Sequence, residues 1–66
     1  MNNILEAAVG IVVDGYRADR TGQRQPAGLD KAVSAAHAAG YSSADIFGAA
    51  DRRFGQELID NAGQYR

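Results

Sequence analysis

The sequence contains no cysteine and a single histidine, His37. The lack of cysteine excludes disulfide bridges and thiolate metal sites, and a zinc ion would find only carboxylates beside one imidazole. We therefore expect no metal and no other cofactor. A chain of 66 residues makes one domain, 1–66, which buries only ~60% of the surface that its unfolded state exposes. Small folds without such cross-links usually gain stability from a partner subunit.

The sequence also lacks a long apolar run and an excess of positive charge. No segment approaches the ~20 apolar residues that a membrane-spanning helix needs. The N-terminus has no basic start followed by a cleavage site, so we expect a cytoplasmic chain without membrane contact. The formal net charge is -1, whereas nucleic-acid-binding domains usually carry a basic balance or a dense basic face. The overall charge therefore does not favour nucleic acid as a partner, but it is compatible with a local basic patch.

Recognisable catalytic motifs are missing as well. The sequence has no glycine-rich phosphate loop after a strand, no paired-carboxylate motif and no nucleophile with its base. His37 follows Ser34 by three residues, but no Ser, Cys, Asp or Glu stands four residues after it. We therefore interpret His37 as a structural residue near a helix end, and we predict that the protein is not an enzyme.

What the sequence does contain is helical periodicity. Apolar residues recur at the i, i+3, i+4 and i+7 spacing of a helix face in three segments. We expect helices over 3–19, 29–39 and 43–61. A polar loop with the only proline, Pro26, separates the first two. The predicted fold class is all-α, a compact three-helix bundle, or a four-helix bundle if the last segment breaks at Gly55.

Three features predict where these helices begin and end. Gly40 follows the second segment directly and suits the left-handed residue that ends a helix. Ser42 and Asp45 have the spacing of a capping box, which starts the third helix. Gly63 is expected to end the third helix.

The first segment allows one alternative. Residues 9–13, Val-Gly-Ile-Val-Val, are followed by Asp14-Gly15, which is also compatible with a strand that enters a hairpin turn. No good partner strand follows Gly15, so we favour the helix. At ~100° per residue, the apolar arc of that helix covers roughly 200°, about twice what an ordinary surface helix needs. Either this helix is the central one, or a second copy of the chain covers it.

The segments on both sides of Gly40 have the skeleton of a helix-turn-helix corner, with Ala36 before it and Ile46 after it. In DNA readers the second helix presents exposed side chains to bases and phosphates. The candidate DNA-contact residues are Ser42, Ser43, Arg52 and Arg53. Asp51 is repelled by phosphates, and Gly48 reads no base. We therefore favour a structural corner, and a DNA-binding transcriptional regulator is the alternative function.

The favoured function is a non-enzymatic protein-interaction module. The wide apolar arc, the missing cross-links and a line of small residues at Ala44, Gly48 and Gly55 indicate close contact with another chain. We expect a homodimer that binds a larger protein partner, as a small inhibitor or adaptor of phage or mobile-element type would. Tyrosine and arginine are enriched at interface hot spots. The candidate contact residues are therefore Arg17, Arg20, Arg24, Tyr41, Arg52 and Tyr65.

Overall fold

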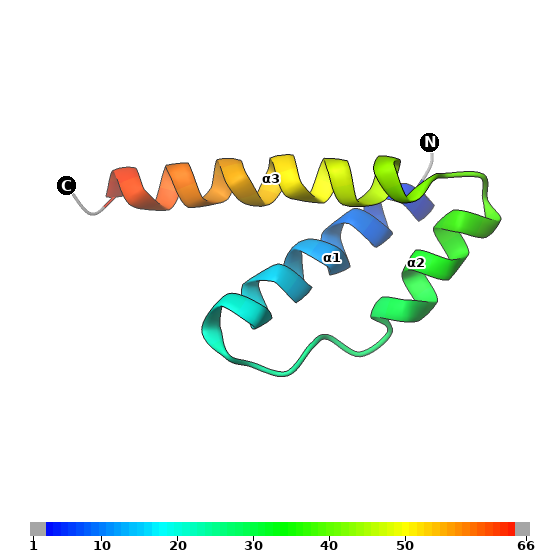
Figure 1. The fold of residues 1–66 in the computed structure, drawn as a ribbon, viewed down its shortest axis with the longest axis horizontal. Coiled ribbons are helices and arrows are strands. Elements are labelled where there is room, and N and C mark those ends of the chain that lie inside the picture. The colour runs from blue at the N-terminus through cyan, green and yellow to red at the C-terminus, as the bar shows by residue number, and fades with distance from the viewer. Residues whose placement is uncertain (1–2, 65–66) are drawn as a thin grey trace.

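The computed structural model describes residues 3–64, and over this range it contains three α-helices and no strand (Figure 1). The helices are α1 (Asn3–Thr21), α2 (Leu29–Ala38) and α3 (Ser43–Gln64). The chain reverses direction between α1 and α2, and α3 then crosses α1 and extends beyond it (Figure 1). The predicted all-α three-helix bundle is confirmed, and the hairpin alternative for residues 9–15 is wrong. Tyr65 lies outside the described residues.

The helix ends agree with the sequence to within three residues. α1 continues to Thr21, whose hydroxyl donates to the Arg17 carbonyl at 2.9 Å. α3 does not break at Gly55, and it also passes through Gly63, so the prediction that Gly63 ends this helix is wrong. A glycine raises the free energy of a helical position by only about 1 kcal/mol relative to alanine. That penalty is too small to end a long helix by itself.

The corner between α2 and α3 is built by local hydrogen bonds. Gly40 has a φ of 101°. Its backbone N–H donates a hydrogen bond to the His37 carbonyl at 3.0 Å, and the Tyr41 N–H donates one to the Ala36 carbonyl at 3.0 Å. These two bonds form a Schellman motif, which ends α2. The predicted left-handed role of Gly40 is therefore confirmed.

The capping box that starts α3 is also present in full. The Ser42 hydroxyl accepts a hydrogen bond from the Asp45 N–H at 3.1 Å, and the Asp45 carboxylate accepts one from the Ser42 N–H at 2.9 Å. Each side chain thus satisfies a backbone donor that the first turn of a helix leaves without a partner. Together with Gly40, this pair fixes where the chain changes direction.

α1 is the central helix, because it packs against both α2 and α3 while those two contact each other much less. Its residues Val9 and Val13 are buried beside Ile46 of α3, which has no exposed surface. The remaining buried core residues are alanines and one further valine: Ala8, Val12, Ala18, Ala36 and Ala50. Most of the wide apolar arc of α1 is therefore covered within one chain, although Ile4 stays 45% exposed.

Polar contacts hold α3 across α1 on the surface. The Arg17 guanidinium donates to both carboxylate oxygens of Glu57, one of them at 2.8 Å, and also contacts Asp14. Arg53 pairs with Glu6 at 3.1 Å. A bidentate arginine–carboxylate pair is stronger and more directional than a single contact. These pairs therefore fix how α3 lies on α1 more than they add to stability, since exposed ion pairs contribute ~0–1 kcal/mol.

Candidate functional site

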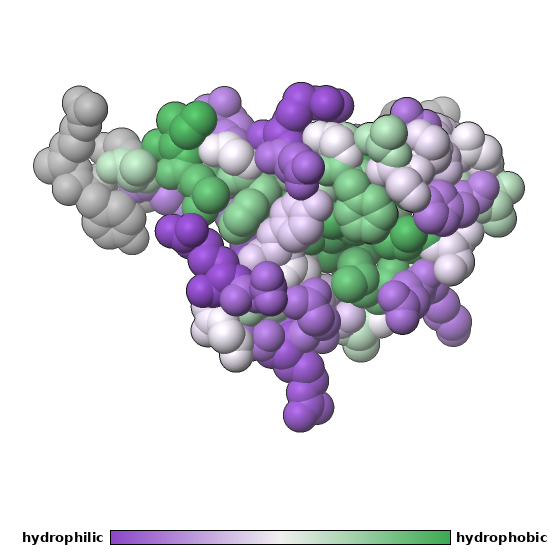
Figure 2. Space-filling view, in the orientation of Figure 1, coloured by the Kyte–Doolittle hydropathy of each residue, from purple (hydrophilic) through white to green (hydrophobic). Residues whose placement is uncertain are grey.

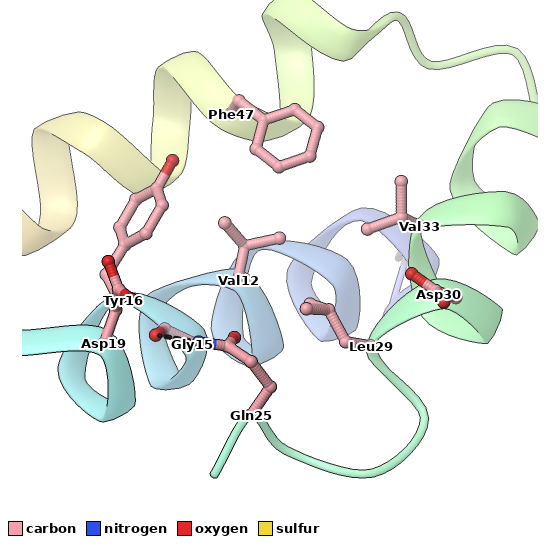
Figure 3. Close-up of a pocket in the computed structure, with 9 residues that line it drawn as sticks. All are labelled: Val12, Gly15, Tyr16, Asp19, Gln25, Leu29, Asp30, Val33 and Phe47. Carbon is pink, nitrogen blue, oxygen red and sulfur yellow. Dashed lines mark hydrogen bonds between the residues drawn. The ribbon is translucent and has the colours of Figure 1, made fainter. Parts of the chain in front are cut away.

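An apolar groove of about 370 Å³ lies between α1, α2 and α3 (Figure 3). We call it the three-helix groove. It is lined by Val12, Gly15, Tyr16, Asp19, Gln25, Leu29, Asp30, Val33 and Phe47. In the space-filling view, hydrophobic surface is visible between α2 and α3, with hydrophilic side chains around it (Figure 2). The groove is at the lower end of the ~300–1,000 Å³ range of protein binding pockets.

The groove exists because α2 and α3 diverge from their corner (Figure 1). Leu29 and Val33 are four residues apart on α2 and therefore share one face. That face packs on α1 beside Val12 but is not covered by α3. Phe47 of α3 lies across the groove from them and is 37% exposed (Figure 3). Half-covered apolar side chains from three helices thus face one open space.

The loop between α1 and α2 closes one side of the groove. The Gln25 side-chain amide donates to the Gly15 carbonyl at 3.2 Å. A Cβ at position 15 would lie 2.7 Å from the Gln25 Oε1 atom, which is too close for an unchanged side chain. Glycine at position 15 therefore leaves room for the end of the Gln25 side chain, which lies at the groove (Figure 3).

Tyr16 forms the wall at the α1 end of the groove. Its ring packs against Phe54 with 5.6 Å between the ring centroids. Burial raises the pKa of Tyr16, and a hydrogen bond with the Asp51 carboxylate raises it further. The ring contact with Phe54 joins this wall to α3.

Two carboxylates border the groove. Asp19 lies beside Tyr16 near the end of α1, and Asp30 lies on the first turn of α2 on the opposite side (Figure 3). Both are exposed. The groove thus combines an apolar floor with negative charge at its two sides.

The structure separates the predicted contact residues rather than gathering them. Arg17 and Arg52 line a shallow hollow on the α1–α3 side, where Arg17 is already paired with Glu57. Arg20 lines a different hollow beside Phe54, and Arg24 is exposed in the loop. Tyr41 is half-buried against the core at the corner. None of these residues lines the three-helix groove.

The candidate DNA-contact residues are likewise spread out. Ser42 caps α3, Ser43 Oγ lies 3.1 Å from His37 Nε2, and Arg53 pairs with Glu6. Arg52 is exposed. His37 thus contacts Ser43 across the corner rather than Ser34 on its own helix, in accord with a structural role.

The sequence does not reveal the three-helix groove, because Leu29, Val33 and Phe47 follow the spacing of apolar helix faces and such faces are normally expected to be buried. One signal was available: Phe47 is one residue after Ile46, so it lies about 100° around the helix from the most buried position. Phe47 therefore stands at the edge of the apolar face. The angle between α2 and α3, which opens the groove, has no counterpart in the periodicity of either segment.

The chain matches no protein-family model, and searches among curated proteins and solved structures gave no match. In the described part of the chain, no group of three or more metal-ligating side chains could hold a metal ion. None of the helices over residues 3–64 is long and apolar enough to cross a bilayer. The geometry of the three-helix groove is therefore the basis for a functional proposal.

Proposed function

We propose that this protein is a non-enzymatic protein-interaction module that receives apolar side chains of a larger protein partner in the three-helix groove. The observation that carries the proposal is the half-covered apolar surface of Leu29, Val33 and Phe47 around one preformed space. Binding sites are typically concave, apolar and largely preformed, with a few polar groups at their border. The three-helix groove has each of these properties.

The same surface explains how binding adds stability. The buried core consists of alanines, valines and one isoleucine, which is little apolar area for three helices. Burial of apolar surface contributes roughly 25 cal/mol per Å². A partner that covers Phe47 and Val33 would thus extend the core of the free chain, and it would do so without new cross-links.

The electrostatics favour a protein partner over DNA. Arg53 and Arg17 are engaged by carboxylates of the chain itself, so phosphate contacts would first have to break these pairs. Asp45 and Asp51 lie on the helix that would have to approach the duplex. A gel shift with random duplex DNA at low salt tests whether the chain binds DNA. Retardation that decreases steeply with salt would favour the alternative of a DNA-binding regulator.

The direct test is photo-crosslinking in the native host. A photoreactive phenylalanine analogue replaces Phe47 in the full chain, and adducts are identified by mass spectrometry. We expect one discrete partner, and we expect the additional substitution Val33→Gln to abolish the adduct. The matched control carries the analogue at Ala44, an exposed position of the same helix that does not line the groove. The proposal fails if both positions give the same adducts, or if Phe47 gives none.

We also propose that a second copy covers part of the remaining surface. Ile59 of α3 is 67% exposed, more than the other exposed large apolar side chains, Ile4 and Phe47. A second copy that packs on this part of α3 would remove that side chain from water.

A further inference from the structure

We infer that the partner segment in the three-helix groove carries a bulky apolar side chain flanked by lysine or arginine. This inference rests on the proposed function and adds to it the chemistry of the partner. It depends on the two carboxylates at the sides of the groove, Asp19 and Asp30 (Figure 3).

The chain has eight acidic side chains. Asp19 and Asp30 differ from the other six. The other six have partners: Arg17 contacts Asp14 and Glu57, Arg53 contacts Glu6, Ser42 contacts Asp45, Tyr16 contacts Asp51 and Gln56 contacts Asp60. Within residues 3–64, no hydrogen bond or ion pair is present at the carboxylates of Asp19 and Asp30. The two unpartnered carboxylates therefore both border the same apolar groove.

The position of Asp19 is unfavourable for the free chain. It lies in the last turn of α1, where the helix dipole disfavours negative charge. Asp30 lies in the first turn of α2, where the helix dipole favours negative charge and so partly stabilises its carboxylate. A basic group bound between the two sides of the groove would therefore relieve an existing repulsion at Asp19 and pair with Asp30.

Within residues 3–64, no cation of the chain forms an ion pair with either carboxylate. Asp19 and Arg20 both line the neighbouring hollow beside Phe54 without pairing, and Lys31 is not among the residues that line the groove. Val12 and Leu29 of the apolar floor lie between the two carboxylates, and Val33 lies on the side of Asp30 (Figure 3). An apolar side chain in the middle with basic groups beside it thus matches the arrangement of the groove. Segments of this kind bind through apolar anchors, and their charges add specificity.

The test uses two short amphipathic peptides of equal length, one built from leucine and lysine and the other from leucine and glutamate. Each is labelled, and its binding to the full chain is measured by fluorescence anisotropy. We expect the leucine–lysine peptide to bind at least about tenfold more tightly, with a preference that decreases as salt is raised. We expect the double variant Asp19→Asn, Asp30→Asn to reduce this preference to within about twofold.

Two controls separate the groove from general charge attraction. The double variant Asp14→Asn, Asp60→Asn changes the net charge equally but alters no groove residue, and it should retain the preference. The variant Phe47→Gln removes an apolar wall and should weaken the leucine–lysine peptide about tenfold. Loss of the preference in the Asp14, Asp60 control, or unchanged binding by Phe47→Gln, would overturn the inference.

The experiments distinguish a failure of the inference about basic partner residues from a failure of the proposal that the groove is the binding site. If the Phe47 photo-adduct persists but the leucine–lysine peptide shows no preference, the inference about basic residues is wrong and the groove remains the binding site. If neither the adduct nor peptide binding is observed, the proposed function and the inference both fail. Binding of a second copy in the groove would appear as a crosslinked homodimer from Phe47, and it would overturn the assignment of a basic partner segment.

Discussion

At Gly40 the backbone has a φ of 101°, a conformation that costs a residue with a side chain roughly 1–2 kcal/mol. We therefore expect Gly40→Ala to lower the free energy of unfolding by about 1 kcal/mol or more, which lowers the Tm of a domain of this size by roughly 4–8 °C. The measurement is thermal and urea denaturation followed by circular dichroism. A Tm equal to that of the wild type would contradict this account of the corner.

Gly10 provides the matched control for Gly40. It lies inside α1, and a Cβ built there meets no atom within 4 Å. Alanine stabilises a helix interior by roughly 0.5–1 kcal/mol relative to glycine. The same substitution, Gly10→Ala, should thus raise the Tm, so the two variants should shift it in opposite directions.

At Glu57 the prediction concerns pH. Hydrogen bonds from Arg17 lower the pKa of the Glu57 carboxyl below its ordinary value of 4.5. A carboxyl whose folded-state pKa is lowered stabilises the fold above its unfolded pKa, and this stabilisation is lost as the pH falls through the folded pKa. Wild-type stability should therefore decrease below about pH 4.5 partly through this group.

The test at Glu57 compares Tm values between pH 7 and pH 3. Glu57→Gln should lower the Tm at pH 7 and make it less sensitive to acid, because the variant has no carboxyl to protonate at this position. Arg17→Gln removes the same ion pair from the other side and should have a similar effect. If both variants keep the full acid dependence of the wild type, the Arg17–Glu57 pair does not contribute to it.

At the scale of the helices, α3 illustrates how burial along one element differs by position. Ile46 has no exposed surface, whereas Ile59 is 67% exposed. We expect Ile46→Val to lower the free energy of unfolding by about 0.5–1.5 kcal/mol. The same change at Ile59 should stay within about 0.5 kcal/mol of the wild type. Urea denaturation at low protein concentration measures both, and equal effects at the two positions would contradict the orientation of α3.

The helices could be predicted from the sequence because their signals are local. Periodic apolar residues, the left-handed Gly40 and the pair Ser42 and Asp45 each depend on a few neighbouring residues, and all of them appear in the structure. The predicted end at Gly63 failed because a glycine weakens a helix without ending it. A glycine therefore ends a helix where its backbone is left-handed, as at Gly40, and not merely because it lies near the end of a periodic segment, as at Gly63.

The candidate site could not be predicted in the same way. Leu29 and Val33 belong to the apolar face of α2 by spacing, but whether α3 covers them depends on the angle between two helices. Likewise, nothing in the residues around Arg17 reveals that it pairs with Glu57, forty positions later. The groove is a consequence of tertiary packing, so only the folded arrangement brings its residues together.

At the scale of the whole molecule, the exposed Ile59 on α3 predicts self-association. We expect sedimentation equilibrium to show a monomer–dimer transition between micromolar and millimolar concentration. Ile59→Asp should shift this transition to higher concentration, because a carboxylate at the interface would lose its hydration. Ile4→Asp changes another exposed isoleucine, at the start of α1, and should leave the transition unchanged. A strict monomer at every concentration would contradict the dimer.

The central claim is that the three-helix groove is the binding surface. The most direct measurement is a ¹⁵N NMR titration of the full chain with the partner segment identified by crosslinking at Phe47. The account predicts that the largest amide shifts fall on groove residues of all three helices, among them Val12, Val33 and Phe47. Shifts confined to the outer face of α3, around Arg52 and Ile59, would contradict it.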